Sequence, residues 1–133
     1  MGGLSLWHLI LVSILLLIPV GVAAVAVSFN RGASALSRKS FTIRVLGLFF
    51  ALVVIGGFIG AATMPTTEGN GQPLNAVLGL AWMICIPYWA ASRLRDMGQP
   101  KKRAIITGIP LVGLFYTIYL MIAARTPAAG ATA

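Results

Sequence analysis

The sequence predicts an all-α membrane protein: a single domain over residues 1–133, built as a bundle of four transmembrane helices with both termini outside. Hydrophobic residues make up 59% of the chain and charged residues only 9%, whereas an ordinary soluble domain has roughly 25% charged residues. A soluble protein of 133 residues could not cover so apolar a chain with so little polar surface.

The positions of the basic residues supply the second observation. Nine of the ten lie in two short segments, 30–44 and 92–103, and each segment separates apolar runs. The segment between Met64 and Ala76 contains no Lys or Arg and carries Glu68, one of only two acidic residues. Because basic loops stay in the cytoplasm, we expect both basic segments on the cytoplasmic side. The tenth cation, Arg125, lies beyond the last apolar run and departs from this rule.

Four apolar runs have close to the ~20 residues that a helix needs to cross the hydrocarbon core of a bilayer. They cover residues 4–29, 45–64, 74–91 and 104–124. No positive charge precedes the first run, so we expect it to remain as a span rather than to be cleaved as a signal peptide. The third helix is expected to continue through Asp96, and Gly108 and Pro110 are expected to kink the fourth.

Asp96 is the only acidic residue on the face that holds nine basic ones. It follows Arg93 by three residues, so the two side chains share one helix face. We predict a structural charge cluster in which Asp96 pairs with Arg93 or Arg95, and also with Arg38 or Arg44. A solvated Asp96 at the edge of a loop is the alternative.

Local signals mark two helix ends and one helix contact. Ser37 suits the N-cap of a helix that leads into the second span. Gly98, followed by Pro100, suits a left-handed helix C-cap. Gly56 and Gly60 have the spacing of a small-xxx-small contact, which lets helix backbones approach closely in lipid. That contact belongs either to the protein's own bundle or to a dimer interface.

Side chains for catalysis or metal binding are scarce. Cys85 is the single cysteine and His8 the single histidine, and the acidic residues lie at other depths. We therefore expect no enzyme activity, no cofactor and no metal site. The net charge of +8 flanks apolar spans, which favours anionic lipid headgroups over nucleic acid as its partner. The candidates for headgroup contact are Lys39, Lys101, Lys102 and Arg103.

Three segments carry a family resemblance. Residues 35–41 read Ala-Leu-Ser-Arg-Lys-Ser-Phe, residues 92–98 read Ser-Arg-Leu-Arg-Asp-Met-Gly, and residues 109–113 read Ile-Pro-Leu-Val-Gly. In this order, with apolar spans between and after them, they resemble the bacterial membrane family called domain of unknown function 805. Arg95 replaces the histidine that is usual there, and Pro100-Lys101-Lys102 replaces a small and aromatic segment. The resemblance covers residues 35–124 and implies a fold but no activity.

A second family resemblance lies in the first nine residues, Met-Gly-Gly-Leu-Ser-Leu-Trp-His-Leu. They look like the start of the A-type subunit of the twin-arginine translocase, which also has a polar residue just after the tryptophan. The resemblance implies an outer N-terminus and a contact of Trp7 and His8 with partner helices. The hinge and long amphipathic helix of that family have no counterpart here.

These observations favour a non-enzymatic protein of the bacterial inner (cytoplasmic) membrane. We expect an accessory or interaction subunit of a larger membrane assembly, such as one for protein translocation or secretion. Its partner would be another membrane protein or a second copy. The alternatives are a small homo-oligomeric channel or transporter, and a protein that binds anionic lipid or confers immunity to a toxin.

Overall fold

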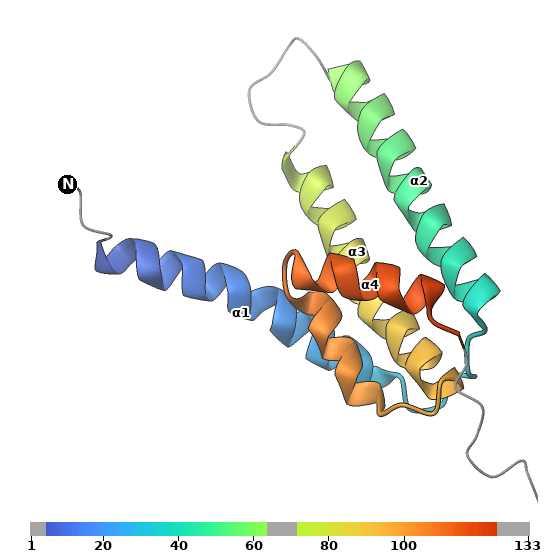
Figure 1. Ribbon diagram of the computed structural model, residues 1–133. Coiled ribbons are helices and arrows are strands. Elements are labelled where there is room, and N and C mark those ends of the chain that lie inside the picture. Colours follow the sequence, from blue (N-terminus) through green and yellow to red (C-terminus); the bar gives the residue numbers. More distant parts are fainter. Residues whose placement is uncertain (1–4, 64–71, 125–133) are drawn as a thin grey trace, which may run out of the picture.

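The computed structural model describes residues 5–63 and 72–124, with side chains described for residues 5–58 and 76–124. All of its regular elements are helices, and no strand occurs within these ranges, which confirms the all-α prediction (Figure 1). In chain order the elements are α1 (Leu6–Phe29), α2 (Arg38–Thr63), α3 (Gln72–Asp96), the 3₁₀ helix η1 (Lys101–Gly108) and α4 (Val112–Ile122).

Three of these helices are long and apolar enough to cross a membrane. The qualifying stretches are Leu6–Phe29, Arg38–Phe58 and Ala76–Asp96. α2 and α3 run side by side as an antiparallel pair, whereas the amino-terminal half of α1 extends away from the other helices (Figure 1). Only the second half of α1 is packed, with Pro19, Ala23, Ala26 and Val27 buried.

α2 begins earlier than the second apolar run does. The Ser37 hydroxyl accepts a hydrogen bond from the Ser40 backbone N–H at 3.3 Å, so Ser37 is the N-cap that the sequence predicts. Arg38, Lys39 and Arg44 therefore lie in the first two turns of a helix. The basic segment 30–44 is therefore irregular up to Ser37 and helical from Arg38 onward, as the predicted N-cap implies.

α3 ends in a Schellman motif. Gly98 has a φ of 68°, the Gln99 N–H donates to the Leu94 carbonyl at 2.8 Å, and the Gly98 N–H donates to the Arg95 carbonyl at 3.1 Å. This pair of bonds defines the motif, and the left-handed C-cap predicted at Gly98 is confirmed. The chain then turns sharply into η1.

The predicted fourth span, residues 104–124, is wrong. The structure divides this segment between η1, of 8 residues, and α4, of 11 residues. Each is about 16 Å long at ~2.0 Å and ~1.5 Å per residue, roughly half of the ~30 Å hydrocarbon core. Residues 101–124 instead form a helical hairpin.

The physical reason is the turn at Ile109-Pro110-Leu111. A residue before proline avoids helical angles, and Ile109 is extended, with φ −81° and ψ 120°. The Val112 N–H donates to the Pro110 carbonyl at 2.7 Å, and Leu111 has φ 63° and ψ −56°. These values describe a strained γ-turn, so the chain reverses here instead of kinking.

Both ends of the hairpin lie at the same end of the molecule. η1 begins five residues after Asp96, and the carbonyls of Leu120 and Ala123, at the end of α4, accept hydrogen bonds from Arg93 of α3. α1 ends here, α2 begins here with Arg38 and Lys39, and α3 ends here with Arg93 and Arg95 in its last turn. We therefore call this end of the molecule the basic end. Residues 101–124 thus enter and leave the bundle from one side (Figure 1).

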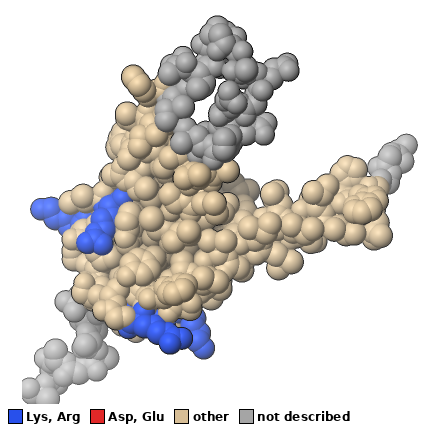
Figure 2. Space-filling view, turned by 180° about the vertical axis from the view of Figure 1, so that it is seen from behind, with Lys and Arg blue, Asp and Glu red and all other residues tan. Residues whose placement is uncertain are grey.

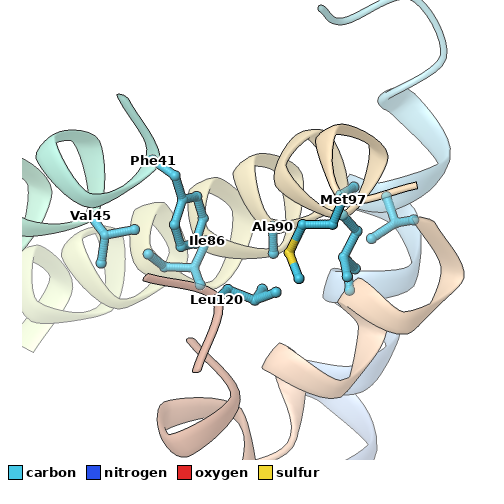
Figure 3. Close-up of a cluster of buried hydrophobic side chains, with 10 residues drawn as sticks. Phe41, Val45, Ile86, Ala90, Met97 and Leu120 are labelled. Carbon is cyan, nitrogen blue, oxygen red and sulfur yellow. The ribbon is translucent and has the colours of Figure 1, made fainter. Parts of the chain in front are cut away.

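The hydrophobic core is built from every helix. In Figure 3, Leu120 of α4 lies close to Ile86 and Ala90 of α3, with Phe41 and Val45 of α2 beside them. η1 contributes Ala104 and α1 contributes Val27. The returning half of the hairpin therefore completes the core between α2 and α3.

Gly108 sets how closely the hairpin packs against α1. A Cβ atom at Gly108 would lie 2.6 Å from the Ala23 Cβ and 2.8 Å from the Pro19 carbonyl oxygen. We expect Gly108→Ala to lower the free energy of unfolding by about 1–3 kcal/mol, because backbone has to move to make room. Thermal unfolding of the purified protein in detergent measures this.

The matched control is Gly47→Ala in α2, where an added Cβ meets nothing within 4 Å. This substitution should leave stability unchanged or raise it slightly. Equal melting temperatures for the two variants would contradict the close contact between η1 and α1.

Candidate functional site

The polar site of this protein lies at the basic end, where α3 passes between the ends of α1 and α4. Asn30, Ser92, Arg93, Arg95 and Asp96 form it, and we call these five residues the arginine clamp. Asn30, Ser92 and Arg93 are each at most 1% exposed. Buried polar groups need hydrogen-bond partners, and the clamp supplies them from its own members and from helix ends.

Arg95 binds the end of α1. Its Nη2 donates to the backbone carbonyl of Asn30 at 2.8 Å and to the side-chain oxygen of Asn30 at 3.0 Å. Its Nη1 donates to the carbonyl of Ala33. Because the last carbonyls of a helix have no partner within it and carry partial negative charge, the guanidinium caps α1.

Arg93 does the same for α4. Its Nη2 donates to the Ala123 carbonyl at 2.6 Å and its Nε to the Leu120 carbonyl at 3.4 Å. Its Nη1 forms an ion pair with Asp96. Residues two apart on a helix do not face each other, so the two arginines reach opposite neighbours from one turn of α3.

Asn30 joins α1 directly to α3. Its Nδ2 donates to the Tyr88 carbonyl at 2.6 Å and to the Ser92 hydroxyl at 2.7 Å. Its side-chain oxygen accepts from Arg95. Sequence reasoning did not select Asn30 or Ser92. An asparagine directly after an apolar run is a C-cap signal, and that signal would have identified Asn30.

The structure brings three of the four predicted cluster residues into the clamp: Arg93, Arg95 and Asp96. Arg38 is exposed at the start of α2 and lines, with Arg93 and Asp96, a cavity of about 320 Å³. Arg44 is exposed farther along α2. The pairing of Asp96 with Arg93 is present, and Arg95 caps α1 instead.

The other predicted site residues lie outside the clamp. Gly56 faces α3, since a Cβ there would lie 3.8 Å from Leu78, and the surroundings of Gly60 lie outside the described side chains. Trp7 and His8 are exposed near the start of α1, where His8 shares a 2.8 Å hydrogen bond with Ser5. The candidates for headgroup contact, Lys39, Lys102 and Arg103, are exposed and Lys101 is partly buried.

The described part of the chain also has apolar openings. A groove of about 860 Å³ lies between α1 and α3, and a cavity of about 230 Å³ lies at the turn of the hairpin, beside Pro19 and Pro87. Within residues 5–63 and 72–124, no group of three His, Cys, Asp or Glu side chains comes together to hold a metal ion. The chemistry that this arrangement supplies is the binding of helix ends and of apolar groups.

No protein-family model, curated protein or solved structure matches this chain. The resemblances of residues 35–124 and of the first nine residues to known families therefore stay predictions.

The clamp predicts that substitutions of Arg95 and Arg103 change the free energy of unfolding by different amounts. Arg95→Met should lower the free energy of unfolding by about 1.5–3 kcal/mol, because it removes charged hydrogen bonds to the end of α1. Arg103→Met is the control: Arg103 is exposed and its side chain donates to Gln99, so its loss should cost less than about 0.5 kcal/mol. Similar melting temperatures for both variants would contradict the clamp.

Proposed function

We propose that this chain is a multi-pass protein of a bacterial inner membrane, in which α1, α2 and α3 cross the bilayer. The hairpin 101–124 would dip into the cytoplasmic half of the membrane and return. The support is the basic end: the nine Lys and Arg residues of the two basic segments lie in the junctions that meet there or in the adjoining turns of α2 and α3. Figure 2 shows the Lys and Arg of one face in two groups, and the rest of the described surface in this view carries no Lys, Arg, Asp or Glu.

The positive-inside rule assigns this basic end to the cytoplasm. Three crossings then place the start of α1 outside and Ala124, the last described residue, inside. This arrangement replaces the one with both termini outside, which depended on a fourth crossing. Arg125 lies outside the described residues and directly follows Ala124 in the sequence. With Ala124 inside, Arg125 no longer departs from the positive-inside rule.

We further propose that the protein acts as a non-enzymatic interaction subunit of a larger membrane assembly. The observation that carries this proposal is the first half of α1: every residue from Leu6 to Ile18 is exposed. Lipid provides no hydrophobic drive that would hold this half against its own bundle. It is therefore available to a helix of another membrane protein.

One stripe of this half is the best candidate for the contact. Trp7, Leu11 and Leu15 follow one another at four-residue spacing, and each is between 64% and 74% exposed. Such residues lie on one face of a helix and form a continuous apolar ridge. The stripe includes Trp7, which belongs to the nine residues that look like the start of a twin-arginine translocase subunit. A translocation machine is therefore the first partner to test.

The experiment is copurification from the native membrane in mild detergent. Leu11→Ala/Leu15→Ala should reduce the recovery of a stoichiometric companion by at least about tenfold, since truncation of central contact residues costs over ~1 kcal/mol each. The control pair is Phe50→Ala/Val54→Ala on α2, at the same spacing and with exposures of 61% and 64%.

A companion lost from the α1 pair but retained by the α2 pair is the expected result. Equal recovery in both pairs would contradict the assigned face. A homo-oligomer with no other protein would contradict the accessory role and favour the channel alternative.

A further inference from the structure

The groove between α1 and α3 is lined by two regular stripes of apolar side chains. Figure 1 shows the two helices converging toward the basic end, and the lining residues of the groove come from both helices. α3 contributes Leu80, Ile84 and Tyr88, which are four residues apart. α1 contributes the residues between Ile14 and Phe29 that face the same way, among them Ile18, Gly21 and Val25.

One end of the groove adjoins the clamp in the sequence and through a hydrogen bond. Tyr88 lines the groove, and its carbonyl accepts the hydrogen bond from Asn30. Arg95 lies about two turns further along α3 and is only partly buried. Within the part of the chain that the structure describes, the hydrogen bonds of Arg95 all end on uncharged acceptors, in Asn30 and Ala33. Arg31, the next residue after Asn30, is exposed.

We propose that this groove binds one anionic phospholipid, with its acyl chains between α1 and α3 and its phosphate at Arg31 and Arg95. Charge complementarity assigns the headgroup, because an apolar groove here ends beside two cations at the membrane surface. The proposal rests on the membrane placement given above and adds a specific ligand to it.

The length of the groove suits a lipid of one leaflet. The groove follows α1 from Ile14 to Phe29, which is about 22 Å at ~1.5 Å per residue. One leaflet has a hydrocarbon depth of about 15 Å, and the inclined α1 matches it.

Gly21 offers a way to fill the groove without disturbing the fold. It lines the groove, and a Cβ added there meets nothing within 4 Å. Gly47 in α2 is the matched control, because its surroundings are equally open and it does not line the groove. Gly21→Leu and Gly47→Leu therefore add the same side chain to two exposed helix positions.

The test is native mass spectrometry of the full chain in detergent, titrated with phosphatidylglycerol or with phosphatidylcholine. The wild-type protein and Gly47→Leu should each retain one phosphatidylglycerol. Gly21→Leu should reduce that retention by about tenfold. The new side chain would displace part of an acyl chain, and the loss of contact with two of its methylene groups already corresponds to about a tenfold change in binding. Arg31→Gln should reduce the preference for phosphatidylglycerol over phosphatidylcholine by about fivefold, the usual effect of one cation near a lipid surface.

Equal retention by Gly21→Leu and Gly47→Leu would overturn the proposal, and so would equal binding of the two lipids by the wild-type protein. A protein that copurifies with the wild type and is lost from Gly21→Leu would assign the groove to a helix instead. Leu11 and Leu15 do not line the groove, so Leu11→Ala/Leu15→Ala should retain the lipid. Failure of the lipid site and failure of the α1 contact are thus separate results.

Discussion

Two arginines on one turn of α3 hold the ends of two other helices, and the rest of the structure depends on this. The last carbonyls of a helix have no partner within it, and Asn30 and Arg93 are buried away from water here. Arg95 binds the C-cap carbonyl of α1, and Arg93 binds the carbonyls of Leu120 and Ala123 at the end of α4. A cation at a buried helix C-terminus contributes up to ~2 kcal/mol, and Asp96 compensates part of the charge. Together with the bonds from Asn30 to Tyr88 and Ser92, these bonds fix α1 and the far end of α4 at the basic end.

Much of this fold could be predicted from the sequence, because local chemistry decides it. The three long helices follow from apolar length, and the ends at Ser37 and Gly98 follow from cap chemistry. The hairpin could not be predicted in the same way. Residues 104–124 are long and apolar enough for a span, and proline usually only kinks a membrane helix. What decides the reversal is tertiary: Gly108 lies against Pro19 and Ala23, and Arg93 binds the far end of α4.

The candidate site was predictable only in its charged members. The three-residue spacing of Arg93 and Asp96 predicts their pairing. The hydrogen bond from Asn30 to Ser92 joins residues 62 positions apart, and no local sequence pattern predicts it. The clamp also divides α1 into a half that is packed in the bundle and a half that is exposed. The second half of α1 is held at the basic end, and its first half leaves the bundle. A fixed base with an exposed apolar arm suits an interaction subunit, and the groove at the base of the arm suits a lipid.

The return of the hairpin to the basic end is the central claim, and cysteine accessibility tests it most directly. In a Cys85→Ala background, single cysteines would replace Lys102, Leu111 and Ala124, and a membrane-impermeant maleimide would be applied to intact cells and to inside-out vesicles. The account predicts labelling of Lys102→Cys and Ala124→Cys only in inside-out vesicles, with Leu111→Cys protected in both. Labelling of Ala124→Cys in intact cells would contradict it, because residues 101–124 would then cross the membrane.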